Sequence, residues 1–429
     1  MKYPNTYYAS TAIEAPNRSP LTQDLSIDVC IVGAGIAGLS CALELLKLGK
    51  SVVILEKEST AWGASGRNGG LVSPGWAQGM DALEAKLGLS KAQNLYQLSR
   101  RGVQMVRDNI SEYALESCDV KYGGLQAGRY PQRDQLLAKQ RTLSEKYDYH
   151  LDFLDVEQVR DVCRSKRYFE GLYSSEEFHF HPLNYCLGLA AQIEKLGGHI
   201  FENTSVLNTD KEGAKHKVVT DKAIVSCEQV VFCGGGYTGK EMPQLKRAFL
   251  PIATYMVVTE PLGDLAKQLI TKEYSIKDDR RAADYYRLVE GDKLLWGSRI
   301  TTDNQTNEQR LSKMLREDLV SVYPELADVK IDKSWSGLMA YSGHKMPIVR
   351  EQSKGSWICS SFGGHGLNTG TICGTLVAQA ICEVNDDYQA FAPFGCDWNG
   401  GVFGPIVANM TYKYLRMRDQ QQEANVPAQ

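Results

Sequence analysis

The sequence predicts an α/β fold in which a parallel-sheet domain is interrupted by a second, α+β domain with an antiparallel sheet. Apolar runs at 26–32 and 51–55 are typical of strands, and helical periodicity occupies 37–48 between them. A strand–helix–strand unit of this kind requires parallel strands. The region 250–296 instead contains runs that alternate apolar and polar residues, which indicates antiparallel strands.

The chain of 429 residues is too long for one hydrophobic core, so two domains are expected. Local patterns predict mainly helical segments over 81–148 with a break at 122–124, a helix at 183–196, strands at 199–201, 204–209, 223–225, 229–233 and 357–361, and helices at 369–382 and 405–418. The parallel-sheet domain is assigned residues 27–85, 155–242 and 342–400, the antiparallel domain residues 86–154 and 243–341, and a C-terminal helix and tail residues 401–429.

Composition narrows the class of protein and its location. Hydrophobic residues make up 43% and charged residues 23%, as in globular proteins, and the net charge of -3 gives no basic excess for nucleic acid. No apolar run reaches the roughly 18 residues of a membrane helix, and the N-terminal segment lacks a signal-peptide core, so a cytoplasmic location is expected.

The 11 cysteines include no C-x-x-C pair, which favours buried free thiols. The three cations of 405–418 are few, so this helix is expected to dock on its own domain rather than on a membrane.

A glycine motif follows the first predicted strand. Gly33, Gly35 and Gly38 form G-x-G-x-x-G at the start of a helix, where the glycines permit a tight turn, close approach of a pyrophosphate and close helix packing. Glu56 ends the second strand, where a carboxylate accepts hydrogen bonds from ribose hydroxyls. Together these features predict a Rossmann-like dinucleotide site, and the acidic residue argues against NADP.

A second glycine-rich segment, GASGRNGG at 63–70, comes soon after the second strand. Small residues allow the backbone to approach a large planar group closely, which favours FAD over NAD; a flexible loop is the plain alternative.

With these motifs in place, the chain resembles the D-amino-acid oxidase superfamily of flavoproteins, and within it the gamma-glutamylputrescine oxidoreductase type. The similar stretches span nearly the whole chain: YYAST, CIVGAGIAGLS, ILEK with GASGRNGG, HPLN, VVFCGGGYTG, DYYRL, the WSG–MP stretch and FGGHGLNTGTICG. The resemblance implies a flavin domain and a substrate domain that faces the flavin ring. It also implies oxidation of an amine to an imine by hydride transfer to flavin N5, with reoxidation by O2.

The resemblance also implies a set of cofactor-binding residues. Gly33, Gly35, Gly38 and Glu56 would hold the ADP part, Ala64, Ser65, Arg67, Asn68, Gly69 and Gly70 would line the flavin, Val206 would lie near the adenine, and Gly364, His365, Gly366 and Leu367 near the pyrimidine edge. Ala34, Ile36, Ala37, Lys57, Leu71, Cys233 and Gly234 complete the expected set.

Two features depart from the family. Sarcosine oxidases attach FAD to a cysteine where this chain has LMAYSGHKMP, which contains none, so FAD is expected to be noncovalent. The arginine with which amino-acid oxidases hold a substrate carboxylate is carried over to no position, so a simple amine stays open beside an amino acid.

Three residues are candidates for catalysis. His365 could donate to the flavin or the substrate, or be structural. Alternation over 285–289 places Tyr286 on the opposite face from Tyr285 and Arg287, so either Tyr286 or its neighbours could border the amine, with core packing as the alternative. Lys345 could place a positive charge near the flavin and so promote its reaction with oxygen.

Three functions remain open on the sequence alone. The first is an FAD enzyme that oxidises a small amine, such as a polyamine derivative. The second is a flavoprotein maturase that oxidises a side chain of a partner protein. The third is a noncatalytic flavin-binding subunit.

Overall fold

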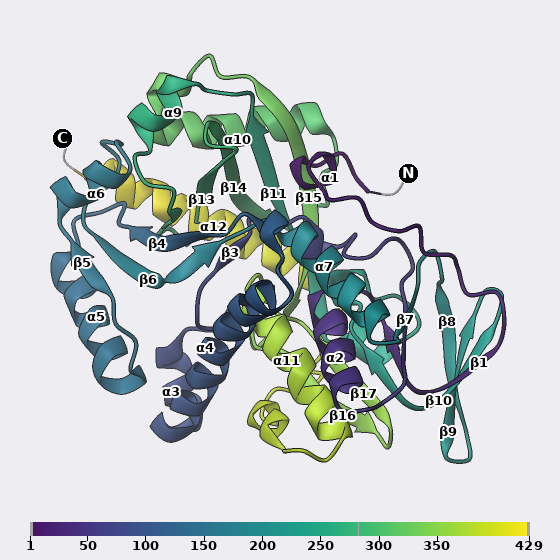
Figure 1. Cartoon of the computed structure of the whole chain (residues 1–429). Helices are drawn as coiled ribbons and strands as arrows, with labels where there is room; N and C mark the ends of the chain where they lie inside the picture. The colour runs from purple at the N-terminus through teal and green to yellow at the C-terminus, as the bar shows by residue number, and fades with distance from the viewer. Residues whose placement is uncertain (1–2, 282, 427–429) are drawn as a thin grey trace.

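The computed structural model describes residues 3–281 and 283–426, which contain two sheets, sheet A and sheet B (Figure 1). Sheet A runs in the order β16 (Ile348–Ser353), β17 (Ser356–Ser360), β10 (Ile224–Phe232), β1 (Leu25–Val32), β2 (Val52–Leu55) and β7 (His199–Phe201), with β9 (Lys215–Thr220) beside β10 and β8 (Val206–Glu212) beside β9. The pairs that join β17, β10, β1, β2 and β7 are parallel. This central part has the predicted Rossmann-like topology.

The central strands of sheet A, β17, β10, β1 and β2, are buried on both faces over much of their length. Along β1, Val29 and Ile31 point into one hydrophobic core cluster, whereas Cys30 and Val32 point into another. This alternation follows from the two-residue repeat of a strand, and burial of both faces explains why the run is apolar throughout.

Four helices pack around the first of these clusters: α2 (Ile36–Lys47), α4 (Leu89–Glu112), α7 (Pro182–Lys195) and α11 (Gly366–Ile381). Helix α7 begins where the sequence predicts a helix, because the His181 ring accepts a hydrogen bond from the Asn184 N–H over 3.1 Å and Pro182 occupies the first turn. In Figure 1, α2 and α11 lie side by side.

Sheet B is larger and mainly antiparallel. Its order is β15 (Ile331–Ser342), β11 (Phe249–Thr259), β14 (Lys293–Thr301), β13 (Tyr285–Val289), β12 (Ser275–Asp278), β4 (Lys121–Ala127), β6 (Gly171–His179) and β3 (Leu71–Val72), with β5 (Asp152–Leu154) beside β6. The pair β12–β4 is parallel, so the predicted antiparallel sheet is of mixed orientation. The remaining helices are α1 (Tyr7–Ser10), α3 (Met80–Leu87), α5 (Arg133–Tyr147), α6 (Val156–Val162), α8 (Pro243–Lys246), α9 (Asp264–Leu269), α10 (Glu308–Val322) and α12 (Gly404–Ala424).

The structure corrects three domain assignments. Strands β3 and β6 belong to sheet B, whereas the sequence assigns 27–85 and 155–242 to the parallel-sheet domain. Helix α4 packs on α11, whereas the sequence assigns 86–154 to the antiparallel domain. The predicted helix break at 122–124 lies within strand β4. β6 escapes sequence analysis because its middle reads as polar, although Ser174 and Glu177 are buried there.

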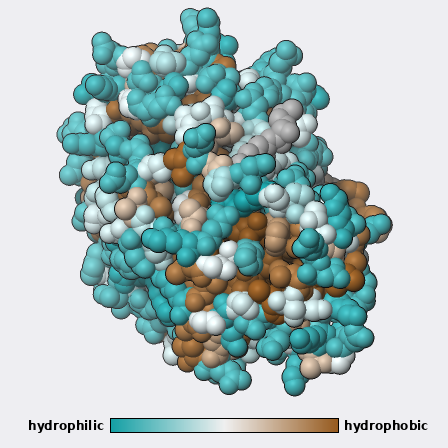
Figure 2. Space-filling model, turned by 45° about the vertical axis from the view of Figure 1, so that its right-hand side comes forward, coloured by the Kyte–Doolittle hydropathy of each residue, from teal (hydrophilic) through white to brown (hydrophobic). Residues whose placement is uncertain are grey.

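All eleven cysteines are free thiols, and nine of them are buried. None of the described helices is long and apolar enough to cross a membrane. In the view of Figure 2, exposed hydrophobic residues gather in the lower half of the molecule, whereas the upper half is largely hydrophilic.

Candidate functional site

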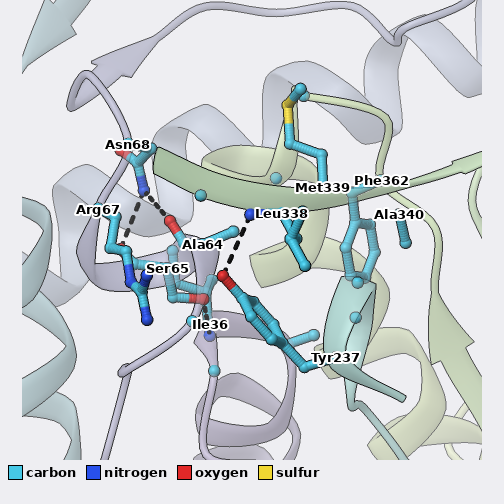
Figure 3. Close-up of a pocket in the computed structure, with 18 of the residues that line it drawn as sticks. Ile36, Ala64, Ser65, Arg67, Asn68, Tyr237, Leu338, Met339, Ala340 and Phe362 are labelled. Atoms are coloured by element: carbon cyan, nitrogen blue, oxygen red, sulfur yellow. Dashed lines mark hydrogen bonds between the residues drawn. The ribbon is translucent and has the colours of Figure 1, made fainter. Parts of the chain in front are cut away.

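A cavity of about 980 Å³ extends from the glycine turn after β1 to the face of sheet B. Its sheet A end is lined by Gly33, Glu56 and Val206, and its sheet B end by Tyr285 and Tyr341. Its volume is at the upper end of the range for sites that bind small molecules and cofactors. Figure 3 shows the middle of this cavity, where the loop that carries Arg67 and Asn68 faces strand β15.

The glycine turn brings backbone close to backbone. Gly33 has a φ of +106°, which favours glycine, and a Cβ added to Gly38 would overlap the carbonyl oxygen of Gly33. The first turn of α2 therefore packs directly on the end of β1. Gly33, Gly35, Ile36 and Ala37 line the cavity, whereas Ala34 and Gly38 shape the turn from behind.

Glu56 lies at the end of β2 and faces the cavity. Its carboxylate accepts hydrogen bonds from the Ala34 N–H over 2.8 Å and the Glu58 N–H over 2.9 Å. Burial raises the pKa of Glu56, and these two backbone hydrogen bonds oppose that rise. Each carboxylate oxygen keeps further acceptor capacity, which suits it to hydroxyl groups in the cavity. Lys57 and Val206 line the same end.

The predicted flavin loop is tied to the start of α2. The Ile36 N–H donates to Ser65 Oγ over 3.0 Å, at the short helical turn η1 (Ala64–Gly66). Asn68 Nδ2 donates to the carbonyl oxygens of Ala64 and Ser65, and its Oδ1 accepts from the Gly70 N–H over 2.8 Å (Figure 3). Asn68 therefore fixes the loop from within, and its neighbours Gly69 and Leu71 line the cavity while Gly70 does not.

Arg67 is a half-buried cation with an unused donor. Its Nε donates to the Trp62 carbonyl oxygen over 2.6 Å, its Nη1 donates to the Ser336 carbonyl oxygen over 3.2 Å, and its Nη2 is buried with no hydrogen-bond partner among the described residues. The guanidinium lies 4.0 Å from the centre of the Trp62 ring. Burial lowers the pKa of Arg67. A buried donor without a partner in a cavity wall is expected to meet an acceptor on a bound group.

A second glycine turn closes the cavity at the start of α11. Gly363 and Gly364 have φ values of +59° and +87°, and His365 is the residue before the helix. Gly364, Gly366 and Leu367 line the cavity. The first N–H groups of a helix have no partner within it, so this end can stabilise negative charge on a bound group. Cys233 and Gly234 line the cavity at the end of β10.

His365 and Lys277 line the same cavity on opposite sides of the domain boundary. Burial, together with the positive charge of Lys277, lowers the pKa of His365 to about 4. The imidazole is therefore neutral near pH 7. Lys277 Nζ donates to Glu177 Oε2 over 3.1 Å, which holds the ammonium group in place.

The structure corrects the prediction for Tyr286. Alternation along β13 turns its side chain away from the cavity into the core of sheet B. There its ring stacks on Trp296 with 4.4 Å between centroids, and its hydroxyl lies 2.9 Å from the Tyr323 hydroxyl. Tyr285 is the neighbour that lines the cavity, with its hydroxyl 3.2 Å from Thr254 Oγ1.

The structure places Lys345 away from the cavity. Lys345 is exposed in the turn after β15 and is not among the described residues that line the cavity, because the chain leaves the cavity wall at Tyr341. Lys277 supplies a positive charge in the cavity instead.

Sequence analysis missed Lys277 and also Trp62, Tyr237 and Met339. Tyr237 follows the GGG turn after β10, and its hydroxyl accepts a hydrogen bond from the Leu338 N–H over 3.1 Å, which joins the two domains (Figure 3). Among these four residues, only Tyr237 has a local sequence signal for a site, because it directly follows the glycine run 234–236.

Comparison with known proteins decides the family. Residues 28–380 match the family model described as FAD dependent oxidoreductase. This chain belongs to the FAD-dependent oxidoreductase family, also called DAO. It is 31% identical to a probable oxidoreductase, OrdL, of Haemophilus influenzae over 97% of both chains. It is also 31% identical to the gamma-glutamylputrescine oxidoreductase of Escherichia coli, over 91% of this chain and 92% of that one.

Solved structures share this fold. Glycine oxidase from Bacillus cereus superimposes with a TM-score of 0.70 at 22% identity, covering 85% of this chain and 97% of its own. L-Proline dehydrogenase from P. horikoshii gives a TM-score of 0.72 at 17% identity, covering 87% and 99%.

The cavity of this FAD-dependent oxidoreductase fits the cofactor of its family. The close contact between Gly33 and Gly38 leaves the turn open to a diphosphate, and the unused donor of Arg67 faces the part of the cavity that the glycine-rich loop lines.

Proposed function

We propose that this enzyme oxidises the carbon–nitrogen bond of a small amine or amino acid, with molecular oxygen as the final electron acceptor. One observation carries the proposal: a single cavity joins Glu56 and the glycine turn of sheet A to Tyr285, Lys277 and His365. The enzyme of Escherichia coli that shares 31% of its residues with this chain is named for its action on gamma-glutamylputrescine, which supports an amine substrate.

The proposed cofactor contacts follow the cavity from one end to the other. Glu56 would accept hydrogen bonds from ribose hydroxyls beside Val206, and the backbone of 33–37 would hold the diphosphate. The loop of 64–71 would border the flavin, and the start of α11 would face its pyrimidine edge. FAD would be noncovalent, since 338–347 contains no cysteine. When bound, FAD supplies the acceptor for the hydride that leaves the α carbon of the amine.

The side chains of this chain would position the amine and keep it neutral. His365 is uncharged near pH 7 and can accept a hydrogen bond from the amine nitrogen, so it does not repel the substrate. Tyr285 and Tyr341 line the cavity, and their rings would shield the reacting carbon from water. After oxidation, water would add to the imine. This hydrolysis releases the nitrogen as ammonia or an amine and leaves a carbonyl product.

The charges at the sheet B end favour a particular substrate class. The described lining residues of sheet B and its loops include the cations Lys277, Arg281 and Arg299 and the acid Asp278. Each cation is paired with an acid that does not line the cavity, Glu177, Asp419 and Asp318 respectively, and Asp278 is paired with Arg280. A substrate carboxylate remote from the reacting amine would therefore bind by sharing one of these cations, whereas a second ammonium group would find no free acid among these lining residues. A gamma-glutamylated amine carries such a carboxylate.

Steady-state assays with gamma-glutamylputrescine, putrescine, sarcosine and glycine test this function. Peroxide and carbonyl product should form in equal amounts, and gamma-glutamylputrescine should have a kcat/KM at least about tenfold above that of putrescine, which lacks the carboxylate. Equal activity on both amines would contradict the proposed recognition. Product without peroxide would contradict oxygen as the acceptor.

We also propose a cytoplasmic location, which the eleven free thiols support, because thiols stay reduced in that compartment.

A further inference from the structure

Helix α12 lies on the molecule with its polar side inward. Asn409 Oδ1 accepts a hydrogen bond from the Thr302 N–H over 3.0 Å, Arg416 Nη2 pairs with Asp318 Oδ1 over 3.3 Å, and Asp419 pairs with Arg281 over 2.6 Å. In Figure 1, α12 (yellow) runs behind sheet B. The helix is therefore attached to the body along its length by polar contacts rather than by an apolar core.

The outward side of α12 is apolar. The exposed large side chains of this helix and of the turn before it are Trp398, Val402, Phe403, Ile406, Val407, Met410, Tyr414 and Met417. Ile406, Met410 and Tyr414 follow one another at intervals of four residues, so their side chains form one stripe along the helix, and Val402 precedes them in the turn before it. We call these eight residues the α12 stripe. Such an arrangement is the reverse of an ordinary surface helix and indicates a docking surface.

The exposed charges beside the α12 stripe are mainly positive. Residues 398–418 contain three cations and no acid, and Lys413 and Arg418 are exposed next to Tyr414 and Met417, whereas one exposed acid, Asp397, precedes Trp398. At the other end, the Asn399 N–H donates to the Arg247 carbonyl oxygen over 2.8 Å, which places exposed Lys246 and Arg247 near Trp398. Of the acids that α12 contacts, Asp318 faces the body and pairs with Arg299 over 2.5 Å, whereas Asp303 is exposed and accepts a hydrogen bond from Asn409.

We propose that the α12 stripe docks this enzyme on an anionic lipid surface. A helix of this length is about 30 Å long, lies flat on the body, and presents apolar side chains with cations at both ends, which is the pattern of an interfacial helix. Trp398, Phe403 and Tyr414 are aromatic residues of the kind enriched at membrane interfaces. In a two-fold contact between copies, the same cations would meet each other, which disfavours a second copy as the occupant. The inference rests on the surface of α12 and is independent of the proposed substrate.

Sedimentation of the FAD-loaded protein with vesicles tests the proposal. The wild type should bind vesicles of phosphatidylcholine mixed with phosphatidylglycerol, should not bind phosphatidylcholine alone, and should be released by salt. Ile406→Glu should lower the partition coefficient at least about tenfold, and Lys413→Glu at least about fivefold. Val384→Glu, which alters a similarly exposed side chain after α11, and Lys91→Glu on α4 should bind like the wild type.

Each alternative has its own outcome. Flavin absorbance and circular dichroism identify any variant that fails to fold, and Lys413→Glu then tests the charge requirement without disturbing the apolar residues. Absence of binding to anionic vesicles would overturn the proposal, as would equal binding by Ile406→Glu. A wild-type dimer that Ile406→Glu dissociates, without vesicle binding, would overturn it in favour of a second copy.

Discussion

Arg287 Nε donates a hydrogen bond to the Gly69 carbonyl oxygen over 2.8 Å and so connects strand β13 of sheet B to the predicted flavin loop. The same guanidinium donates from Nη2 to the Phe180 carbonyl oxygen over 2.9 Å and to the Tyr8 hydroxyl over 3.2 Å. Arg287 is buried and no described carboxylate forms an ion pair with it. It therefore acts as a positioning residue that holds together the predicted flavin loop, the segment directly after β6 and helix α1.

Replacing Arg287 should loosen this junction. Arg287→Met leaves several buried acceptors without donors, so the free energy of unfolding should fall by about 3 kcal/mol or more, and the affinity for FAD should fall with it. Urea denaturation and titration of the apoprotein with FAD measure the two effects. Arg141→Met on exposed helix α5 is the matched control and should change neither. Unaltered FAD affinity in a folded Arg287→Met protein would argue against the positioning role.

The glycine turn should tolerate no side chain at Gly38. A methyl group there would overlap the Gly33 carbonyl oxygen, so Gly38→Ala should cost about 1–3 kcal/mol of stability and weaken FAD binding through displacement of α2. At Gly343, an added Cβ meets nothing within 4 Å, so Gly343→Ala is the control. The comparison uses thermal unfolding and the dissociation constant of FAD. Equal effects of the two substitutions would refute the packing argument.

Substitution of Lys277 and of Lys345 should distinguish a lysine that lines the cavity from one on the surface. Lys277→Met removes the ammonium group beside His365 and leaves buried Glu177 unpaired, so kcat/KM should fall about tenfold or more. Lys345→Met should leave both catalysis and the rate of reoxidation by oxygen unchanged, because Lys345 lies outside the cavity. Stopped-flow measurement of the reductive and oxidative half-reactions distinguishes the two. Slower reoxidation in Lys345→Met would contradict the placement of this residue.

Tyr286 should affect stability and not catalysis. Tyr286→Phe removes one hydroxyl from a buried pair with Tyr323 and should destabilise the protein by about 1–2 kcal/mol while kcat/KM stays within twofold of the wild type. Steady-state kinetics and urea denaturation give both quantities. A large loss of kcat/KM in a stable Tyr286→Phe protein would support the catalytic role that the strand pattern leaves open for Tyr286.

The stability of the protein should fall as the pH drops below neutrality. The folded protein holds the pKa of His365 at about 4, whereas in the unfolded chain it lies near 6.5, so the unfolded state binds more protons between these values. Stability contributed by the neutral imidazole is present above about pH 6.5 and is lost progressively down to about pH 4. His365→Gln should therefore show a shallower fall in the free energy of unfolding over this window. An identical slope would mean that His365 titrates normally in the folded state.

The parts of the site that follow from sequence are those fixed by local spacing. Gly33, Gly38 and Glu56 belong to one strand–helix–strand unit, so their relative positions depend on a short segment alone. Lys277 comes from β12 and reaches the cavity through the folding of sheet B, which no local pattern encodes. For Tyr285 and Tyr286, alternation separated the two faces of β13, but the face toward the cavity depends on packing against Gly69.

The same distinction applies to the fold. Strands β1 and β2 are apolar because both faces of sheet A are buried, and sequence periodicity identifies them. Strand β6 buries Ser174 beside the Tyr149 hydroxyl and pairs Glu177 with Lys277. Because these polar residues are buried, the sequence pattern does not reveal a strand that is buried over much of its length. Helix α12 departs most from expectation, because it docks through its polar side.

Anaerobic titration of the purified flavoprotein with amines tests the central claim most directly. The account predicts that the oxidised flavin absorbance band bleaches on addition of gamma-glutamylputrescine and returns when oxygen is admitted. Putrescine should bleach it far more slowly, because it lacks the carboxylate that the cations of sheet B attract. A protein that binds FAD tightly but is reduced by none of gamma-glutamylputrescine, putrescine, sarcosine and glycine would contradict amine oxidation by this site.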